Sequence, residues 1–185
     1  MRERWTEQEI WNWYQAQPWI SGFNFIPSGA MDGTLWLFQD YKHEEAFRDA
    51  AREIALAKSL GFNSVRVFLP FSLWRGQHNS FNKNLEQFVD LLGKHQMTMM
   101  PVLFGDCCVA KDKYKDPILG EQDEPVPGYF GGNPVTPFDV DTQDGTNIGY
   151  DIIDEPEMEP IVHAYVKELA EQFGQDDRIL IWNVW

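Results

Sequence analysis

The chain has 185 residues, of which 43% are hydrophobic and 24% charged, a balance that excludes an intrinsically disordered protein and fits one folded domain. Lys and Arg number 15 against 29 Asp and Glu, so the net charge is −14 and phosphate backbones and anionic lipid repel the chain. We therefore expect no nucleic-acid partner and no membrane partner. No apolar run reaches the roughly 20 residues of a membrane span.

No apolar signal segment follows Met1, so we expect a cytoplasmic location for the chain as given, or secretion if a leader has been removed. Cys107 and Cys108 are adjacent and cannot link distant segments. Two reduced thiols are the expected state, and a strained vicinal disulfide is the alternative.

The predicted elements alternate between helices and strands. A leading helix falls within residues 1–18, because Thr6 and Glu9 have capping-box spacing. Further helices, in which apolar residues recur at helical spacing, are predicted over residues 44–60, 85–96 and 158–173. Short apolar strands are predicted over residues 19–30, 63–69, 98–104 and 179–185.

This order predicts an α/β protein with a parallel β-sheet and outer helices. Four strands fit either half of a (β/α)8 TIM barrel or the start of a doubly wound sheet. No Gly-rich phosphate loop follows the first strand, and the long loops follow the strands, which favours the half barrel. The segment over residues 105–155 has no sustained period, so we expect a loop over the active-site face.

Five motifs follow one another in a recognisable order. They are GFNFIPS at residues 22–28, SVRVFL at 64–69, PVLF at 101–104, LGEQDEPVPG at 119–128 and RILIWNVW at 178–185. In this order they resemble cellulase-like glycoside hydrolases of the retaining (β/α)8-barrel superfamily that includes family five. The resemblance covers nearly all of the chain and implies that residues 1–185 form a single half-barrel domain with strands one to four.

The resemblance also implies the chemistry. Such enzymes cleave O-glycosyl bonds of β-glycans with a general-acid Glu in an Asn-Glu pair after the fourth strand and a nucleophilic Glu at the end of the seventh. This chain has neither, so we predict no catalytic residue and no turnover by the chain alone. One alternative is a non-catalytic half barrel that binds carbohydrate or a partner, and another is an unrelated doubly wound α/β protein.

Asn24, Arg66, Trp74 and Asp106 are predicted to bind carbohydrate, and Ser28 is a further candidate. The resemblance implies that Arg66 lines the site, and a structural ion pair inside the barrel is the alternative. Asn24 and Ser28 lie at the end of the first strand. Each of them either offers polar groups to a sugar or caps a turn. Asp106, just past the third strand, contacts sugar hydroxyls or caps a turn. Trp74 matches a tryptophan of the family and is predicted to stack on a sugar ring.

We predict no cofactor and no metal site. The four histidines have no zinc-site spacing, and residues 139–145 are only a poor match to a calcium loop. A half barrel exposes two sheet edges, so we expect a homodimer or a complementary half-barrel partner. On the barrel-facing side we expect Val65, Val67, Leu103 and Ile181 to need cover. Two copies would close an eight-stranded ring, unless the leading helix caps the open end.

Overall fold

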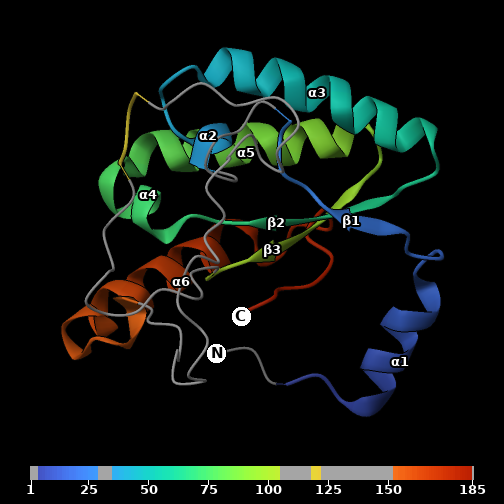
Figure 1. Ribbon diagram of the computed structural model, residues 1–185. Coiled ribbons are helices and arrows are strands. Elements are labelled where there is room, and N and C mark those ends of the chain that lie inside the picture. Colours follow the sequence, from blue (N-terminus) through green and yellow to red (C-terminus); the bar gives the residue numbers. More distant parts are fainter. Residues whose placement is uncertain (1–3, 29–34, 105–117, 122–151, 185) are drawn as a thin grey trace, which may run out of the picture.

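The computed structural model describes residues 4–28, 35–104, 118–121 and 152–184 (Figure 1). Within them the chain is an α/β protein with a three-stranded parallel sheet flanked by helices. The strands are β1 (Gly22–Asn24), β2 (Ser64–Phe68) and β3 (Thr98–Val102), in the order β1-β2-β3. The helices are α1 (Glu7–Ala16), α2 (Leu35–Phe38), α3 (His43–Ser59), α4 (Phe71–Gly76), α5 (His78–Lys94) and α6 (Glu159–Phe173), with short 3-10 turns at Ile152–Asp154 and Pro156–Met158.

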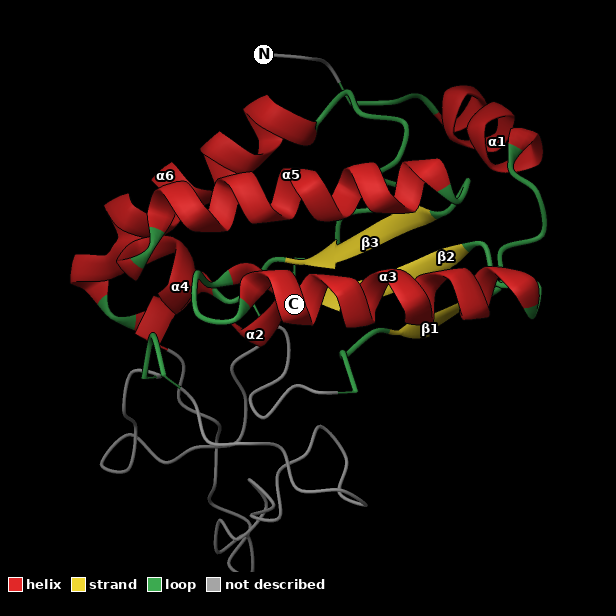
Figure 2. Cartoon of the chain, turned by 90° about the horizontal axis from the view of Figure 1, so that it is seen from above, coloured by secondary structure: helices red, strands yellow, loops and turns green. Residues whose placement is uncertain are grey.

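The two long helices cover one face of the sheet. Figure 2 shows α3 and α5 side by side over the strands. Val65 and Val67 of β2 are fully buried among their side chains, in one cluster with Ile54 of α3 and Phe88 of α5. Because successive strand residues point to opposite faces, Arg66 and Phe68 belong to the other face. The helices and the sheet therefore build a core on one side and leave a second, more polar face.

This packing corrects one expectation. Val65, Val67 and Leu103 were expected to face the open side of a half barrel, but each is at most 4% exposed and belongs to the main core. The alternation along β2 has the opposite phase: the valines lie under the helices and Arg66 lies on the open side. Only Ile181 of the expected set is substantially exposed.

The predicted fourth strand is present only as two isolated parallel bridges to β3. Met99 pairs with Ile179 and Val102 with Asn183, so four residue steps in the 179–183 segment match three steps in β3. One extra residue lies between the bridges, as in a β-bulge, and interrupts the ladder. The segment still lies beside β3, and Leu180 donates its N–H to the carbonyl of Met99 at 2.8 Å.

Helix α6 joins the core through three buried residues on one face, Tyr165, Leu169 and Phe173. The first two are fully buried. The predicted helical period of this segment is therefore confirmed. Figure 2 shows α6 beyond α5, on the side away from α3.

Helix α1 is separate from this core. Its predicted capping box is confirmed, because the Thr6 hydroxyl accepts from the Glu9 N–H and the Glu9 carboxylate accepts from the Thr6 N–H. None of its residues is buried. Figure 1 shows the helix standing off the start of β1, away from α3. No helix among the described residues is long and apolar enough to cross a membrane.

Candidate functional site

The open face of the sheet carries a row of three residues in register. Asn24 of β1 lies beside Arg66 of β2, which lies beside Met100 of β3. Parallel pairing sets this row, because equivalent positions of neighbouring strands point to the same face. The row is polar at β1 and β2 and apolar at β3. The structure thus brings two of the four predicted site residues together.

Arg66 is held loosely in this row. Its Nη1 donates to the Asn24 side-chain oxygen at 3.4 Å, and its guanidinium carbon lies 4.5 Å from the centre of the Phe68 ring. Asn24 is exposed and Arg66 is half-buried. Within the described part of the chain Arg66 has no ion pair with a carboxylate, so the structural ion pair that was the alternative for this residue is not seen there. Among the described residues, its N–H groups donate only to Asn24.

Trp74 is buried, whereas a ring that stacks on a sugar has to be exposed. The residue is in α4 and is only 8% exposed. Its ring stacks on Phe71, with centroids 6.0 Å apart, and is tilted against Tyr165 at 5.2 Å. The indole thus packs against core side chains, and in this arrangement the ring fills the protein interior.

The other expected groups are divided between the core, the surface and the part of the chain outside the described residues. Asp106, both cysteines, the 139–145 segment and most of the 105–155 loop lie outside the described residues. Within that loop, Gly120 donates its N–H to Gln39 at 3.0 Å, and a Cβ on Gly76 would collide with Leu119. Leu119 therefore lies against the end of α4, the helix that follows β2, and Gly120 lies against the residue that follows α2.

Ser28 bonds to the protein itself. Its hydroxyl and its N–H both donate to the Glu53 carboxylate of α3, which fixes the turn after β1. The alternative of a turn-stabilising role, rather than a sugar contact, therefore fits Ser28 better.

A polar cluster joins α5 to α6 and has no signal in the sequence. His78 Nε2 lies 2.9 Å from a Glu168 carboxylate oxygen, and the Asn82 amide donates to the other oxygen. The hydrogen bond that the His78 ring donates to the Glu168 carboxylate raises the pKa of His78. Burial acts to raise the pKa of Glu168, but the hydrogen bonds of His78 and Asn82 outweigh it, so the pKa is lowered. His78 and Glu168 are far apart in sequence, which is why spacing alone does not find them.

The described residues hold no group of three His, Cys, Asp or Glu side chains close enough together to bind a metal ion. The chemistry on the open face is therefore that of planar hydrogen-bonding groups: a guanidinium and a primary amide, side by side, next to an aromatic ring. Comparisons of the chain with protein-family models, with curated proteins and with solved structures give no match.

Proposed function

We propose that the sheet face carrying Asn24 and Arg66 binds carbohydrate, in a half-barrel domain related to retaining glycoside hydrolases. The observation that carries the proposal is the in-register pair itself. An exposed amide that can both donate and accept lies beside a guanidinium that, within the described part of the chain, donates only to this amide, and such planar groups suit the paired hydroxyls of a sugar ring. The five ordered motifs of the sequence point to the same ligand class.

Two features support the barrel-type architecture. The strand order is sequential, and the 179–183 segment continues it on the far side of β3 without reversing direction. A doubly wound sheet would reverse the order at its switch point and place helices on both faces. Here the second face instead carries Arg66 and its neighbours.

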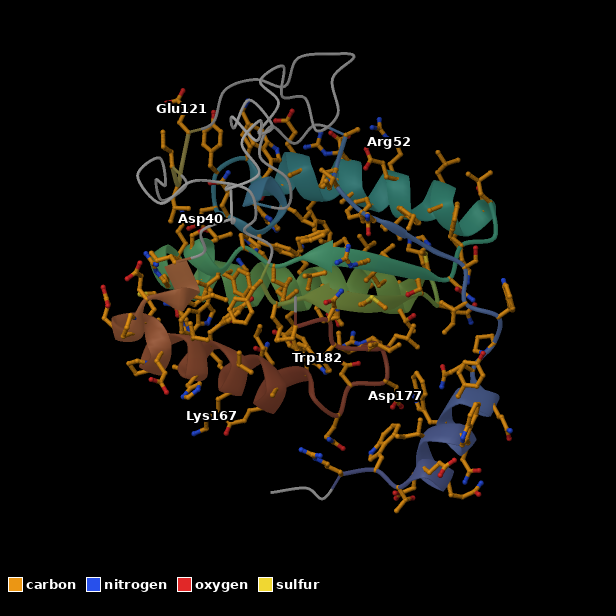
Figure 3. All side chains as sticks on the ribbon, turned by 60° about the horizontal axis from the view of Figure 1, so that its bottom comes forward. Asp40, Arg52, Glu121, Lys167, Asp177 and Trp182 are labelled. Atoms are coloured by element: carbon orange, nitrogen blue, oxygen red, sulfur yellow. The ribbon has the colours of Figure 1, made fainter. Side chains whose placement is uncertain are left out.

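The experiment is a binding titration with short β-glucan and β-xylan oligosaccharides, followed by calorimetry or by amide chemical shifts. Arg66→Met keeps much of the aliphatic stem and removes every donor, so we expect binding at least about tenfold weaker, as for the loss of one charged hydrogen bond. Asn24→Ala should act in the same direction. The matched control is Arg52→Met, because Arg52 projects from the solvent side of α3 (Figure 3).

Two results would contradict the proposal. One is an absence of binding by the unaltered chain at millimolar oligosaccharide. The other is binding that Arg66→Met and Arg52→Met leave equally unchanged. Binding lost in Arg66→Met alone supports the assignment of this face.

A further inference from the structure

Two apolar surfaces of the chain lack a partner among the described residues. The first is on α1, where Ile10, Trp11 and Tyr14 lie on one face and are 49%, 51% and 60% exposed. Glu7 lies at the start of the same face, so the apolar part of this face covers the last two turns of α1. None of the residues of α1 is buried against the sheet or its helices.

The second surface is a groove between β1 and α3, with a volume of about 290 Å³. Apolar side chains make most of its wall, with Leu56 of α3 and Leu60 at the end of that helix 60% and 69% exposed. The remaining apolar side chains of the wall are Phe23, Phe25, Ile26, Ala57 and Phe62. The groove runs along the outer side of β1, where the three-stranded sheet has no further strand.

The connection between α1 and β1 directs the helix away from its own groove. Asn63 holds this connection by donating to the Trp19 carbonyl and accepting from the Ser21 N–H, both at 2.8 Å. Only Gln17 and Pro18 remain between α1 and this anchor. A residue before proline is confined to extended conformations, and Gln17 has φ −76° and ψ 143°. A reversal of the chain at this point is therefore disfavoured.

We propose that α1 docks into the β1–α3 groove of a second copy of the chain, in a reciprocal exchange. The anchored, extended connection presents α1 as an arm beyond its own body, and the aromatic face of that arm matches the apolar wall of the groove. The helix has 10 residues and is about 15 Å long, similar to the stretch from Glu53 of α3 to its C-cap Leu60 that lines the groove. A twofold axis lets each copy give an arm and receive one.

The test is the mass in solution between about 1 and about 100 μM, because the dimer population follows the protomer concentration. We expect the unaltered chain to approach about 43 kDa, twice the 21.5 kDa of one chain, as for a twofold dimer. Trp11→Glu on the arm and Leu56→Glu in the groove each place a charge in the contact. Both positions are exposed in the single chain, so the fold should survive, and each variant should dissociate at least about tenfold more readily.

The decisive experiment mixes the two variants. Trp11→Glu has a damaged arm and an intact groove, and Leu56→Glu has the reverse. The mixture should therefore form a heterodimer through one intact arm at concentrations where each variant alone is monomeric. Ile161→Glu, at an exposed position of α6, is the matched control and should leave the mass unchanged. A monomer at every concentration would overturn the proposal. So would a dimer unaffected by either variant, as an edge-to-edge ring would give, or two monomeric variants that do not complement each other.

Discussion

The imidazole Nε2 of His78 lies 2.9 Å from a carboxylate oxygen of Glu168, and this contact links the first turn of α5 to the middle of α6. Asn82, one turn further along α5, donates to the second carboxylate oxygen. The pair is partly exposed, with the His78 side chain 47% and the Glu168 side chain 33% accessible. It is therefore a surface clamp between two helices that also share the aromatic core beneath it.

The clamp predicts a pH dependence of stability. The pKa of His78 is raised, so its contribution is complete below about pH 6.5 and is lost as the pH rises through the folded-state pKa. The pKa of Glu168 is lowered from its ordinary 4.5, so its contribution is complete above that value and is lost as the pH falls through the folded-state pKa. The pair should stabilise the fold most between these two limits.

His78→Gln should therefore reduce the free energy of unfolding by about 0.5–1 kcal/mol at pH 5.5 and by much less at pH 8.5, since an exposed pair is worth little. Urea denaturation at the two pH values measures this. His163→Gln, an exposed histidine on α6, is the control and should show no such difference. Equal losses at both pH values in His78→Gln would mean that the ion pair is not the cause.

Arg178 forms a second link, between the segment after α6 and α5. Its Nη2 donates to Asp176 at 2.6 Å and its Nε to the other oxygen of the same carboxylate at 2.9 Å, while Nη1 reaches Asp90 at 2.5 Å. These hydrogen bonds lower the pKa of Asp176. Because one guanidinium binds two carboxylates, the contact is stronger than an ordinary surface pair.

We expect Arg178→Leu to cost about 1–2 kcal/mol at low salt and less at about 1 M salt, where charges are screened. The control is Arg52→Leu, which removes an exposed pair with Asp49 at 3.2 Å on α3 and should cost at most about 0.5 kcal/mol. Chemical denaturation of both variants at two salt concentrations compares them. A similar small loss in both would show that the bidentate geometry adds nothing.

The buried hydrogen bond of Tyr165 should contribute to the stability of the fold. Its ring is fully buried among the aromatic side chains around α4, and its hydroxyl donates to the Leu103 carbonyl just past β3 at 3.1 Å. Tyr165→Phe keeps the ring and leaves that carbonyl without this donor, so we expect a loss of about 1–2 kcal/mol. Tyr14→Phe, at an exposed position of α1, should change stability by less than about 0.5 kcal/mol. Thermal and urea unfolding of the pair of variants should differ accordingly.

Local sequence patterns predicted the elements that depend on local forces. The α3 face with Ala50, Ile54 and Ala57 is buried as its spacing indicated, and Gly61 ends this helix region with φ +95°. That angle suits glycine because a Cβ disfavours it. Capping and amphipathic periodicity act over a few residues, so one sequence is enough to find them.

The features that depend on distant contacts were missed. Helix α5 begins at His78, seven residues before the apolar repeat that starts at Leu85, and α4 before it was not predicted. Phe71 and Trp74 of α4 are buried because Tyr165 of α6 packs on them, nearly a hundred residues later in the chain. Which face of the sheet the β2 valines occupy likewise depends on the side that the helices cover. The alternation of valines in the sequence alone does not determine it.

Our last prediction concerns turnover. Retaining glycoside hydrolysis needs two carboxyl groups about 5 Å apart, one protonated as the acid and one ionised as the nucleophile. The resemblance places the acid in an Asn-Glu pair, and the 185 residues contain no such dipeptide. Glu53 is the carboxylate that lines the groove beside Asn24, and it is already engaged by Ser28.

We therefore expect the purified chain to release no nitrophenol from aryl β-glycosides above the uncatalysed rate, even where it binds oligosaccharides. The measurement needs long incubations at high protein concentration, with Glu53→Gln prepared in parallel by the same purification. Hydrolysis by the unaltered chain that disappears in Glu53→Gln would contradict the prediction and would identify a catalytic carboxylate that the resemblance does not supply. Equal residual rates in both preparations would not, because they would then come from something other than this carboxylate.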